Sequence, residues 1–483
     1  MSNTRVLELL GASLPAGGLV TGEHAVRPFE TDGLTAIRET PWAVALPESV
    51  AQVRAVLEIC REHGVAVVTR GAGTGLSGGA RPLQDGVLLA LTKMNRITEV
   101  DLDACTATVE PGVTNLAISQ AVRQHGLYYA PDPSSQLACS IGGNVAENSG
   151  GVHCLKYGLT VHNVTGLVVQ TFEGDELTIG GKGLELPGLD LLAVMMGSEG
   201  MLGVVTEVTV KLLPLPTAKR VLLGAFDDLE DAGRAVGAII AQGIIPAGLE
   251  MMDNPSIRAA EDFAAAGYPR EAAAILLCEL DGTEEEVEHD AERVRTVLES
   301  HGAEVRMAAE EAEQERLWKG RKSAFPAMGR IAPDYYCMDG TIPRSELAGV
   351  LAGIGRLADE AGLQVANVFH AGDGNLHPLI LFDANEGDQL ERAEALGGRI
   401  LELCVEVGGT VTGEHGVGVE KLDQMCVQFN DTELAQFHAL KAAFDPAGLM
   451  NPGKAIPTLA RCSELGGMHV HQGRLPHPEL ERF

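Results

Sequence analysis

Apolar residues at helical or strand spacing divide the first part of the chain into regular elements. Residues 48–63 place apolar side chains on one face of a helix, with Ser49 suited to cap its start and Gly64 to end it. Short apolar runs at 65–69 and 86–92 predict two strands separated by a glycine-rich loop. This pattern is typical of a domain that mixes helices and strands.

The same pattern continues as far as a proline-rich break. Residues 105–110 predict a strand, and Thr114 is placed to cap a helix that runs to His125. Residues 167–180 predict a β-hairpin. A later strand ends in Pro-Leu-Pro at 214–216, after which the rhythm of the pattern changes. We therefore place a domain boundary at this point.

Beyond the break the elements alternate as β-α-β-β-α-β, which is the order of a ferredoxin-like unit. The predicted elements are strand 221–226, helix 229–241, strand 246–252, strand 273–280, helix 284–301 and strand 303–308. A helix at 344–361, a strand at 364–369 and a helix at 386–407 follow. The tail at 457–483 has no regular pattern, and we expect it to be irregular and peripheral.

Composition limits the partners of the chain. Its 483 residues are 45% hydrophobic, enough for sizeable cores, and carry a formal net charge of -31. This charge argues against nucleic acid and anionic membrane surfaces as partners, and an anionic substrate would need a local positive site. No apolar run reaches the length of a membrane span, and the first residues lack the apolar core of a signal peptide. We expect a soluble, cytoplasmic protein.

Nine cysteines are scattered along the chain without a C-x-x-C pair. An odd number of scattered cysteines is unfavourable for a disulfide framework, and it predicts mostly buried thiols in a reducing compartment. Without clustered cysteines, an iron–sulfur site within this chain is not expected.

The first glycine-rich loop contains a G-x-G-x-x-G motif at 73–78. A nicotinamide-binding turn of this type requires a helix directly after the loop, whereas here Gly79, Pro82 and Gly86 lead into a strand. The context therefore excludes that interpretation. Consecutive glycines still let backbone N–H groups approach a diphosphate, although a plain glycine turn remains an alternative for this loop alone.

Two further glycine-rich segments strengthen the case for a cofactor. Residues 131–151 contain GG and SGG pairs, which we interpret as too rich in glycine for regular structure. Residues 197–210 form a third loop that runs into a strand. Three such loops in one domain can line one extended ligand, such as a dinucleotide.

Two polar, glycine-rich loops in the second half carry the candidate chemistry. FHAGDGNLHP supplies His370 and His377, and GEHGVG supplies Glu414 and His415. The first three are suitable ligands for a divalent metal, and His415 is left free. The alternative is that all four only bond to loop backbone. If the glycine loops bound a nucleotide substrate, these four residues would also fit the active site of a metallohydrolase.

The three glycine loops, RGAGTGLSGG, PDPSS with SIGGNVAENSGG, and GSEGMLGV, resemble the FAD-binding domain of the vanillyl-alcohol-oxidase (PCMH) type. Within that group the chain resembles the FAD-linked D-2-hydroxyacid dehydrogenases over residues 38–456. The resemblance implies an α+β fold with four segments. They are a helical lead-in at 1–37, an FAD-binding domain at 38–217, a ferredoxin-like FAD-linked oxidase C-terminal domain at 218–456 that holds substrate and metal and ends in a helical segment, and the tail at 457–483.

The resemblance also assigns the residues that line the FAD. No His or Cys lies within 69–81, where covalent relatives tether the flavin, so we expect non-covalent FAD. The assigned residues are Gly71, Ala72, Gly73, Thr74, Gly75, Leu76, Gly78, Gly79, Pro131, Ser135, Ser140, Gly142, Gly143, Asn148, Gly151, Glu199, Gly200, Gly203 and Val205.

H-x-G-D-G-N-x-H and G-E-H-G resemble the motifs of the metal-dependent members of this family. The resemblance implies that His370, His377 and Glu414 hold a divalent metal, zinc or manganese, and that His415 takes the hydroxyl proton while hydride passes to flavin N5. It places Arg321 at the substrate carboxylate, a task that suits a planar guanidinium. Lys322 is a second candidate, and a solvated basic patch is the alternative.

The segments WKGRKSAFPAMGR, DYYCMDGTIPRSEL and FDPAGLMNPGKAIPT resemble the flavin subunits of bacterial glycolate oxidase (glycolate dehydrogenase) complexes. Cys337 occupies the position of a lysine found in hydroxyglutarate-type relatives, which favours a small monocarboxylate. The resemblance implies a second flavin-domain subunit and an iron–sulfur subunit as partners, with membrane contact only through them. The alternative is a stand-alone D-lactate or other D-2-hydroxyacid dehydrogenase.

Overall fold

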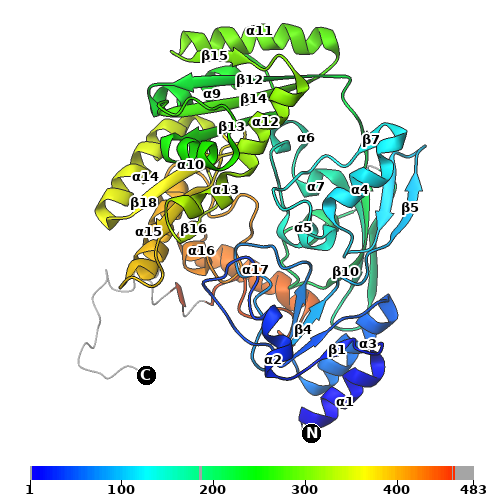
Figure 1. The fold of residues 1–483 in the computed structure, drawn as a ribbon. Coiled ribbons are helices and arrows are strands. Elements are labelled where there is room, and N and C mark those ends of the chain that lie inside the picture. Colours follow the sequence, from blue (N-terminus) through cyan, green and yellow to red (C-terminus); the bar gives the residue numbers. More distant parts are fainter. Residues whose placement is uncertain (1–2, 184–187, 459–460, 463–483) are drawn as a thin grey trace.

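The computed structural model describes residues 3–183, 188–458 and 461–462, and Figure 1 shows the arrangement of the elements. The first part of the chain, blue to cyan, forms two sheets with their helices. The middle part, green to yellow, forms a third and larger sheet. The last described helices return to the first part, where Met450 forms a parallel bridge with Val67. The expected tail at 457–483 lies largely outside the described residues.

The first sheet has the order β1-β2-β4-β3, and β2, β4 and β3 are parallel. The predicted helix is confirmed as α3, with Ser49 accepting a hydrogen bond from the Gln52 N–H and Gly64 ending it at φ 64°. The elements of this part are α1 (Asn3–Ser13), β1 (Leu19–Val20), α2 (Glu23–Val26), η1 (Arg27–Phe29), β2 (Ala43–Ala45), α3 (Val50–His63), β3 (Val67–Arg70) and β4 (Val87–Ala90).

The second sheet is antiparallel, with the order β5-β6-β10-β8-β9. It contains the predicted hairpin as β8 and β9. The elements are β5 (Ile97–Asp101), β6 (Thr106–Val109), α4 (Asn115–Val122), η2 (Arg123–His125), β7 (Leu127–Tyr128), α5 (Ile141–Glu147), α6 (Cys154–Tyr157), α7 (Thr160–Asn163), β8 (Val164–Gln170), β9 (Glu176–Gly180), α8 (Leu191–Met195), β10 (Val204–Lys211) and β11 (Leu213–Pro214).

The third sheet has the order β15-β12-β14-β13-β18-β20-β16, and the six elements predicted as a ferredoxin-like unit are all present. The elements are β12 (Ala218–Phe226), α9 (Leu229–Ala241), β13 (Gly248–Asp253), α10 (Asn254–Ala264), β14 (Ala274–Gly282), α11 (Glu284–Ser300), β15 (Glu304–Met307), α12 (Glu311–Lys322), α13 (Ala324–Ala327), η3 (Met328–Arg330), β16 (Asp334–Cys337), β17 (Gly340–Thr341), η4 (Arg344–Glu346), α14 (Leu347–Ala361), β18 (Gln364–Phe369), β19 (Asn375–Leu376), β20 (Pro378–Phe382), α15 (Gln389–Glu406), α16 (Leu422–Gln428) and α17 (Asp431–Phe444).

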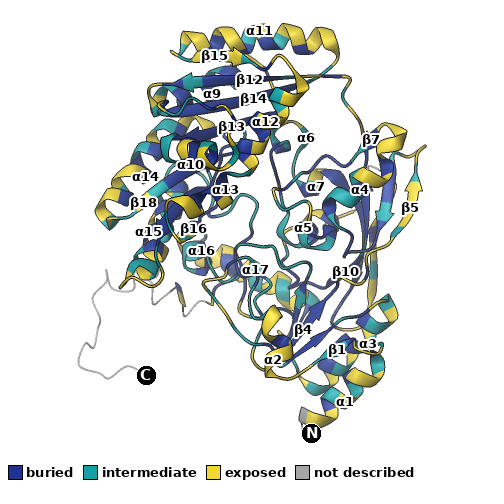
Figure 2. Ribbon diagram, in the orientation of Figure 1, coloured by how far each residue is buried: buried dark blue, intermediate teal, exposed yellow. Residues whose placement is uncertain are grey.

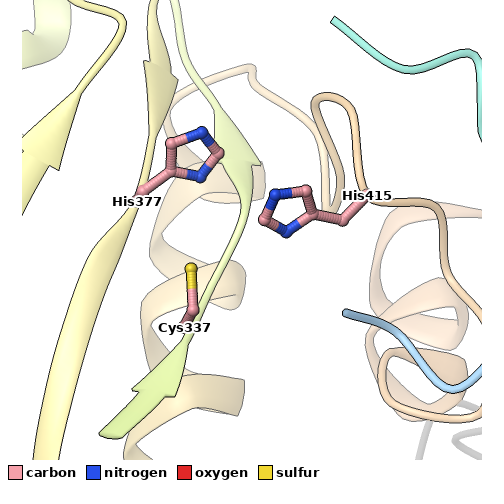
Figure 3. A group of neighbouring side chains, drawn as sticks. All are labelled: Cys337, His377 and His415. Carbon is pink, nitrogen blue, oxygen red and sulfur yellow. The ribbon is translucent and has the colours of Figure 1, made fainter. Parts of the chain in front are cut away.

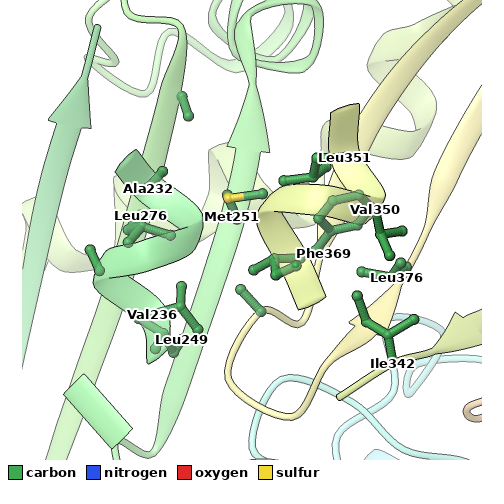
Figure 4. Packing of buried hydrophobic residues seen from close by; sticks show 14 of the residues in the cluster. Ala232, Val236, Leu249, Met251, Leu276, Ile342, Val350, Leu351, Phe369 and Leu376 are labelled. Atoms are coloured by element: carbon green, nitrogen blue, oxygen red, sulfur yellow. The ribbon is translucent and has the colours of Figure 1, made fainter. Parts of the chain in front are cut away.

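A large apolar cluster fixes the strands of this third sheet. Figure 4 shows Val236 of α9 and Val350 of α14 packed near Met251 of β13 and Phe369 of β18. Phe369 is fully buried and directly precedes His370. Burial of apolar side chains is the main favourable term in folding, and packed interiors are rigid. This cluster therefore fixes the backbone that leads into His370.

The second glycine-rich segment corrects one prediction. Helix α5 (Ile141–Glu147) lies within it, although its glycines were expected to exclude regular structure. The Ser140 hydroxyl accepts a hydrogen bond from the Gly143 N–H at the start of the helix, and Asn148 ends it at φ 55°. Capping at both ends and tertiary packing outweigh the low helix propensity of two glycines.

One pair of cysteines also departs from the expectation of free thiols, because Cys426 and Cys462 form a disulfide. Six of the seven other cysteines are buried and Cys105 is partly exposed, as expected for thiols that pack in cores. Figure 2 shows that burial follows the sheets, whereas the outer faces of the helices are exposed. Among the described helices, none combines the length and apolarity needed to cross a membrane.

Candidate functional site

A single cavity of about 520 Å³ brings the glycine loops and the polar loops together. This volume is within the usual range for ligand and cofactor sites. The predicted residues that line it are Gly71, Ala72, Gly73, Thr74, Gly75, Leu76, Gly79, Ser135, Ser140, Gly142, Gly143, Glu199, Gly200, Gly203, Val205, Arg321, Lys322, His370, His377, Glu414 and His415.

Four residues predicted to line the cofactor do not line this cavity: Gly78, Pro131, Asn148 and Gly151. Three of them make structural contacts. The Pro131 carbonyl accepts a hydrogen bond from the Asn115 amide, and Asn148 ends α5. Gly151 has φ 150°, and a Cβ there would lie 2.5 Å from the Asp132 backbone. Glycine-rich motifs thus mark tight turns as well as ligand contacts.

The first glycine loop lies between the parallel strands β3 and β4, with no helix between them, as its sequence context predicted. Two of its glycines have no room for a side chain. A Cβ on Gly71 would lie 2.2 Å from the Ser140 hydroxyl, and one on Gly73, at φ 74°, would lie 2.1 Å from the Arg70 guanidinium. This cradle of bare backbone fits the diphosphate of FAD, because N–H groups can approach its oxygens closely.

The three predicted metal ligands converge at one end of the cavity. His370 follows β18, His377 precedes β20, and Glu414 comes from a loop after α15. Glu414 Oε1 lies 3.0 Å from His377 Nε2 and 3.5 Å from His370 Nε2. One donor atom from each residue lies within 4.8 Å of the others. Two imidazoles and a carboxylate are a donor set that divalent zinc or manganese accepts.

A buried carboxylate joins the metal candidates to the predicted carboxylate-binding arginine. Glu250 accepts a hydrogen bond from His370 Nδ1 at 2.8 Å, and its other oxygen lies 2.5 Å from Arg321 Nη2. The Arg321–Glu250 contact is a charge pair without hydrogen-bond alignment. Arg321 Nε and Nη2 therefore have no hydrogen-bond partner in the described part of the chain, although Arg321 is only 1% exposed. Unsatisfied buried donors that line a cavity fit an anionic ligand.

His415 lies where a general base would be useful. Its ring stacks on that of His377, with the centroids 4.9 Å apart, and its Nε2 is 3.7 Å from Glu414 Oε1, beyond hydrogen-bond distance. Burial lowers the pKa of His415 to about 4, so the imidazole is neutral and can accept a proton. The Glu414 carboxyl is also ionised, because hydrogen bonds from both histidines hold its pKa well below the usual range despite burial.

Figure 3 shows a second group of possible donors, in which Cys337 points toward His377 and His415. Burial raises the pKa of Cys337 well above its usual value. Without a metal this thiol is protonated, whereas the group of His370, His377 and Glu414 already contains an ionised carboxylate.

Sequence reasoning missed several residues that support the site. Asp339 accepts hydrogen bonds from the Gly413, Glu414 and His415 N–H groups at 3.0, 3.1 and 3.0 Å, and thereby fixes the loop that carries the candidate ligand Glu414 and the candidate base His415. Glu250 gave one signal that could have been used: it is one of two acids, with Asp253, in a strand that is buried at every position.

Glu147, which also lines the cavity, was missed as well. Its Oε2 is buried and has no hydrogen-bond partner among the described residues. Burial and the neighbouring Glu199 raise the pKa of Glu147 well above its usual value. Its sequence context, the end of a glycine-rich helix, gave no signal of this environment.

Comparison with known proteins agrees with the geometry. Residues 41–180 match the family described as FAD binding domain, and residues 215–455 match FAD linked oxidases, C-terminal domain. The chain is 63% identical over 484 residues to the glycolate oxidase subunit GlcD of Escherichia coli (strain K12), which covers 100% of this chain and 97% of that protein. It is 33% identical over 441 residues to a D-lactate dehydrogenase of Archaeoglobus fulgidus, covering 90% and 96%.

Solved structures show the same fold. p-Cresol methylhydroxylase superposes with a TM-score of 0.79 at 20% identity, covering 95% of this chain and 97% of that chain. The predicted α+β fold with a PCMH-type FAD-binding domain is thereby confirmed. By its sequence matches, the chain belongs to the FAD-linked oxidases and is an FAD-dependent oxidoreductase.

Proposed function

We propose that the chain oxidises glycolate to its 2-oxo acid as the flavin subunit of a multi-subunit glycolate oxidase. The observation that carries this proposal is the convergence of Arg321, His415 and the His370–His377–Glu414 group on the cavity that the glycine loops line. The 63% identity to a glycolate oxidase subunit supports the choice of substrate. A second flavin-domain subunit and an iron–sulfur subunit are the proposed partners.

In this proposal, Arg321 binds the substrate carboxylate through the N–H groups that do not contact Glu250, and a planar guanidinium can hold both oxygens at once. Glu250 keeps Arg321 and His370 in fixed relative positions, since one carboxylate contacts both. The substrate hydroxyl then lies between the metal candidates and His415. Lys322 also lines the cavity and adds positive charge near the carboxylate.

His415 accepts the hydroxyl proton at Nε2. The ring is neutral, and this nitrogen has no hydrogen-bond partner within the described ranges. Non-covalent FAD supplies the acceptor for the hydride that leaves C2, and a divalent cation at His370, His377 and Glu414 would supply positive charge beside the hydroxyl oxygen. The substrate thus loses a proton from oxygen and a hydride from carbon, which makes a two-electron oxidation.

The function can be tested by mixing the FAD-loaded chain with hydroxyacids in the absence of oxygen and following the flavin absorbance. We expect glycolate to bleach the flavin faster than D-lactate or D-2-hydroxyglutarate. Faster bleaching by D-lactate would favour a stand-alone D-lactate dehydrogenase, an activity named in the relative from Archaeoglobus fulgidus. No bleaching by any hydroxyacid would overturn the proposal.

The same assay tests the base. His415→Asn should lower the rate of flavin reduction by about 10²–10⁴-fold, the usual contribution of a positioned general base. FAD content should stay unchanged, and so should metal content, because the neighbouring Glu414 is the proposed ligand. If the His415→Asn chain reduced its flavin at the wild-type rate at neutral pH, another group would have to take the proton.

A further inference from the structure

The loop that carries Glu414 and His415 is held by carboxylates from two sides. On one side, Asp339 accepts the N–H groups of residues 413–415 and is itself paired with Lys421 Nζ at 3.1 Å. Asp339 and Lys421 are completely buried. The first half of the loop, residues 413–415, is therefore held by side chains of the C-terminal part of the chain.

Glu199 holds the second half of the loop from the flavin side. It lies in the third glycine loop, and its carboxylate accepts the Val417 N–H at 2.7 Å and the Gly418 N–H at 2.8 Å. Glu199 is 4% exposed, so water does not compete for these bonds. The resemblance assigned Glu199 to the cofactor, but its side chain is occupied by the loop backbone.

The backbone at Glu199 is held in an unusual conformation. Its φ is 48°, in the left-handed region that non-glycine residues rarely adopt. Two contacts keep it there: its N–H donates to the Ala146 carbonyl at 2.8 Å, and its own carbonyl accepts from the Asn451 amide at 2.6 Å. Such a position is retained when the surrounding structure requires it, which suggests a functional constraint.

We propose that Glu199 is a positioning residue that couples the flavin site to the loop of the metal ligand and base. The third glycine loop lines the flavin cavity, and FAD packed against it restrains Glu199. Glu199 in turn restrains Val417 and Gly418, two and three residues after His415. Coupling between two binding sites is reciprocal, so FAD should tighten metal binding and metal should tighten FAD binding by the same factor. This inference rests on the proposed metal-dependent function.

Hydrogen exchange on the full chain, with and without FAD, tests the coupling directly. FAD should slow exchange of the Val417 and Gly418 amides, and Glu199→Gln should lose that added protection. The two N–H groups bond to different oxygens of Glu199, and glutamine replaces one of these acceptors by an NH2 donor that would face an N–H group. The amides of 413–415, which Asp339 holds, should stay protected in both proteins. Glu207→Gln on β10 is the matched control, because Glu207 makes no side-chain hydrogen bond among the described residues.

Titration of the same proteins with zinc or manganese gives the second readout. In the wild type, FAD should tighten metal binding by about fivefold or more, the lower limit of typical coupling between sites. Glu199→Gln should abolish this difference while still binding FAD. Unchanged exchange of Val417 and Gly418 on adding FAD to the wild type would overturn the inference even if the variant does not fold.

The two readouts separate this inference from the proposed function. FAD-dependent protection without any metal binding would support the role of Glu199 in holding the loop, while refuting the coupling to metal and the metal part of the proposed function. Metal binding that FAD leaves unchanged, together with unchanged exchange, would refute the coupling and leave the proposed function intact.

Discussion

The flavin side and the substrate side of the cavity are built in different ways. The flavin side consists largely of bare backbone, in which glycines at Gly71 and Gly73 leave no room for a Cβ. The substrate side consists of charged side chains that contact one another, such as Glu250 between His370 and Arg321. A backbone cradle depends on local sequence, whereas a network of charges depends on which distant strands become neighbours. Substitutions should therefore affect the two sides differently.

The largest effect is expected from His377→Ala on the substrate side. Removing one of three ligands should release the metal and slow flavin reduction by about 10³-fold or more, since a Lewis-acid cation contributes several kcal/mol to the barrier. FAD content should not change, because no flavin contact is assigned to His377. Metal analysis, flavin absorbance and anaerobic reduction measure these three quantities. Full activity of the metal-stripped wild type would contradict the metal site itself.

The next largest effect is expected at Arg321. Arg321→Ala should raise KM for glycolate, since loss of a charge-assisted pair in a closed site costs about 2–5 kcal/mol. If Arg321 binds the carboxylate equally in ground and transition states, kcat should change much less than KM. Arg321→Lys is the matched control: it keeps the charge but loses the planar fork, so its KM should lie between those of the wild type and Arg321→Ala. If Arg321→Ala left KM unchanged, the substrate carboxylate would have to be bound by another cation, such as Lys322.

A smaller effect, on stability, is expected away from the cavity, where the second glycine-rich segment meets the third sheet. His153 lies 3.0 Å from Asp132 of that segment and 3.1 Å from Glu279 on β14. Burial lowers its pKa, but the two carboxylates outweigh burial and raise it to about 10. The protonated ring therefore holds the two parts together at neutral pH.

The pH dependence follows from this raised pKa. Below about pH 6.5, the ordinary value, folded and unfolded chains both carry the proton, and the stabilisation is complete. Between about 6.5 and 10 only the folded chain keeps the proton, so stability falls as pH rises, by a few kcal/mol in total. Urea unfolding of the wild type should show this decline, and His153→Asn should show less of it. Parallel pH profiles for the two proteins would contradict the assignment.

The same contrast explains which features could be predicted from sequence. The sequence could single out the candidate metal ligands and His415 because each motif is local, with His370 and His377 seven positions apart. Glu250 lies 120 positions from its partner His370, and Asp339 lies 76 positions from His415. Such pairs depend on strand order in the third sheet, which periodicity does not encode.

Helices were harder to predict where local composition opposed them. Helix α5 contains two glycines, and α10 between β13 and β14 was not predicted at all. In both cases a capping side chain, Ser140 or Asp253, accepts an N–H at the start of the helix. The disulfide between Cys426 and Cys462 spans 36 residues and depends on where the chain runs after α17. Propensity alone cannot supply these tertiary contacts.

The smallest effect is expected on the flavin side, where no side chain should be bonded to the cofactor. Acid or heat denaturation should release all the FAD into solution, because residues 69–81 contain no nucleophilic His or Cys. Cys139 is the one cysteine of the described residues that lines the cavity, so it is the nucleophile to test there. Cys139→Ser should bind and release FAD as the wild type does. Flavin that stays on the denatured wild type but leaves Cys139→Ser would identify Cys139 as a tether. The flavin side would then depend on a covalent side-chain bond, and the contrast between a backbone cradle and a side-chain network would no longer hold.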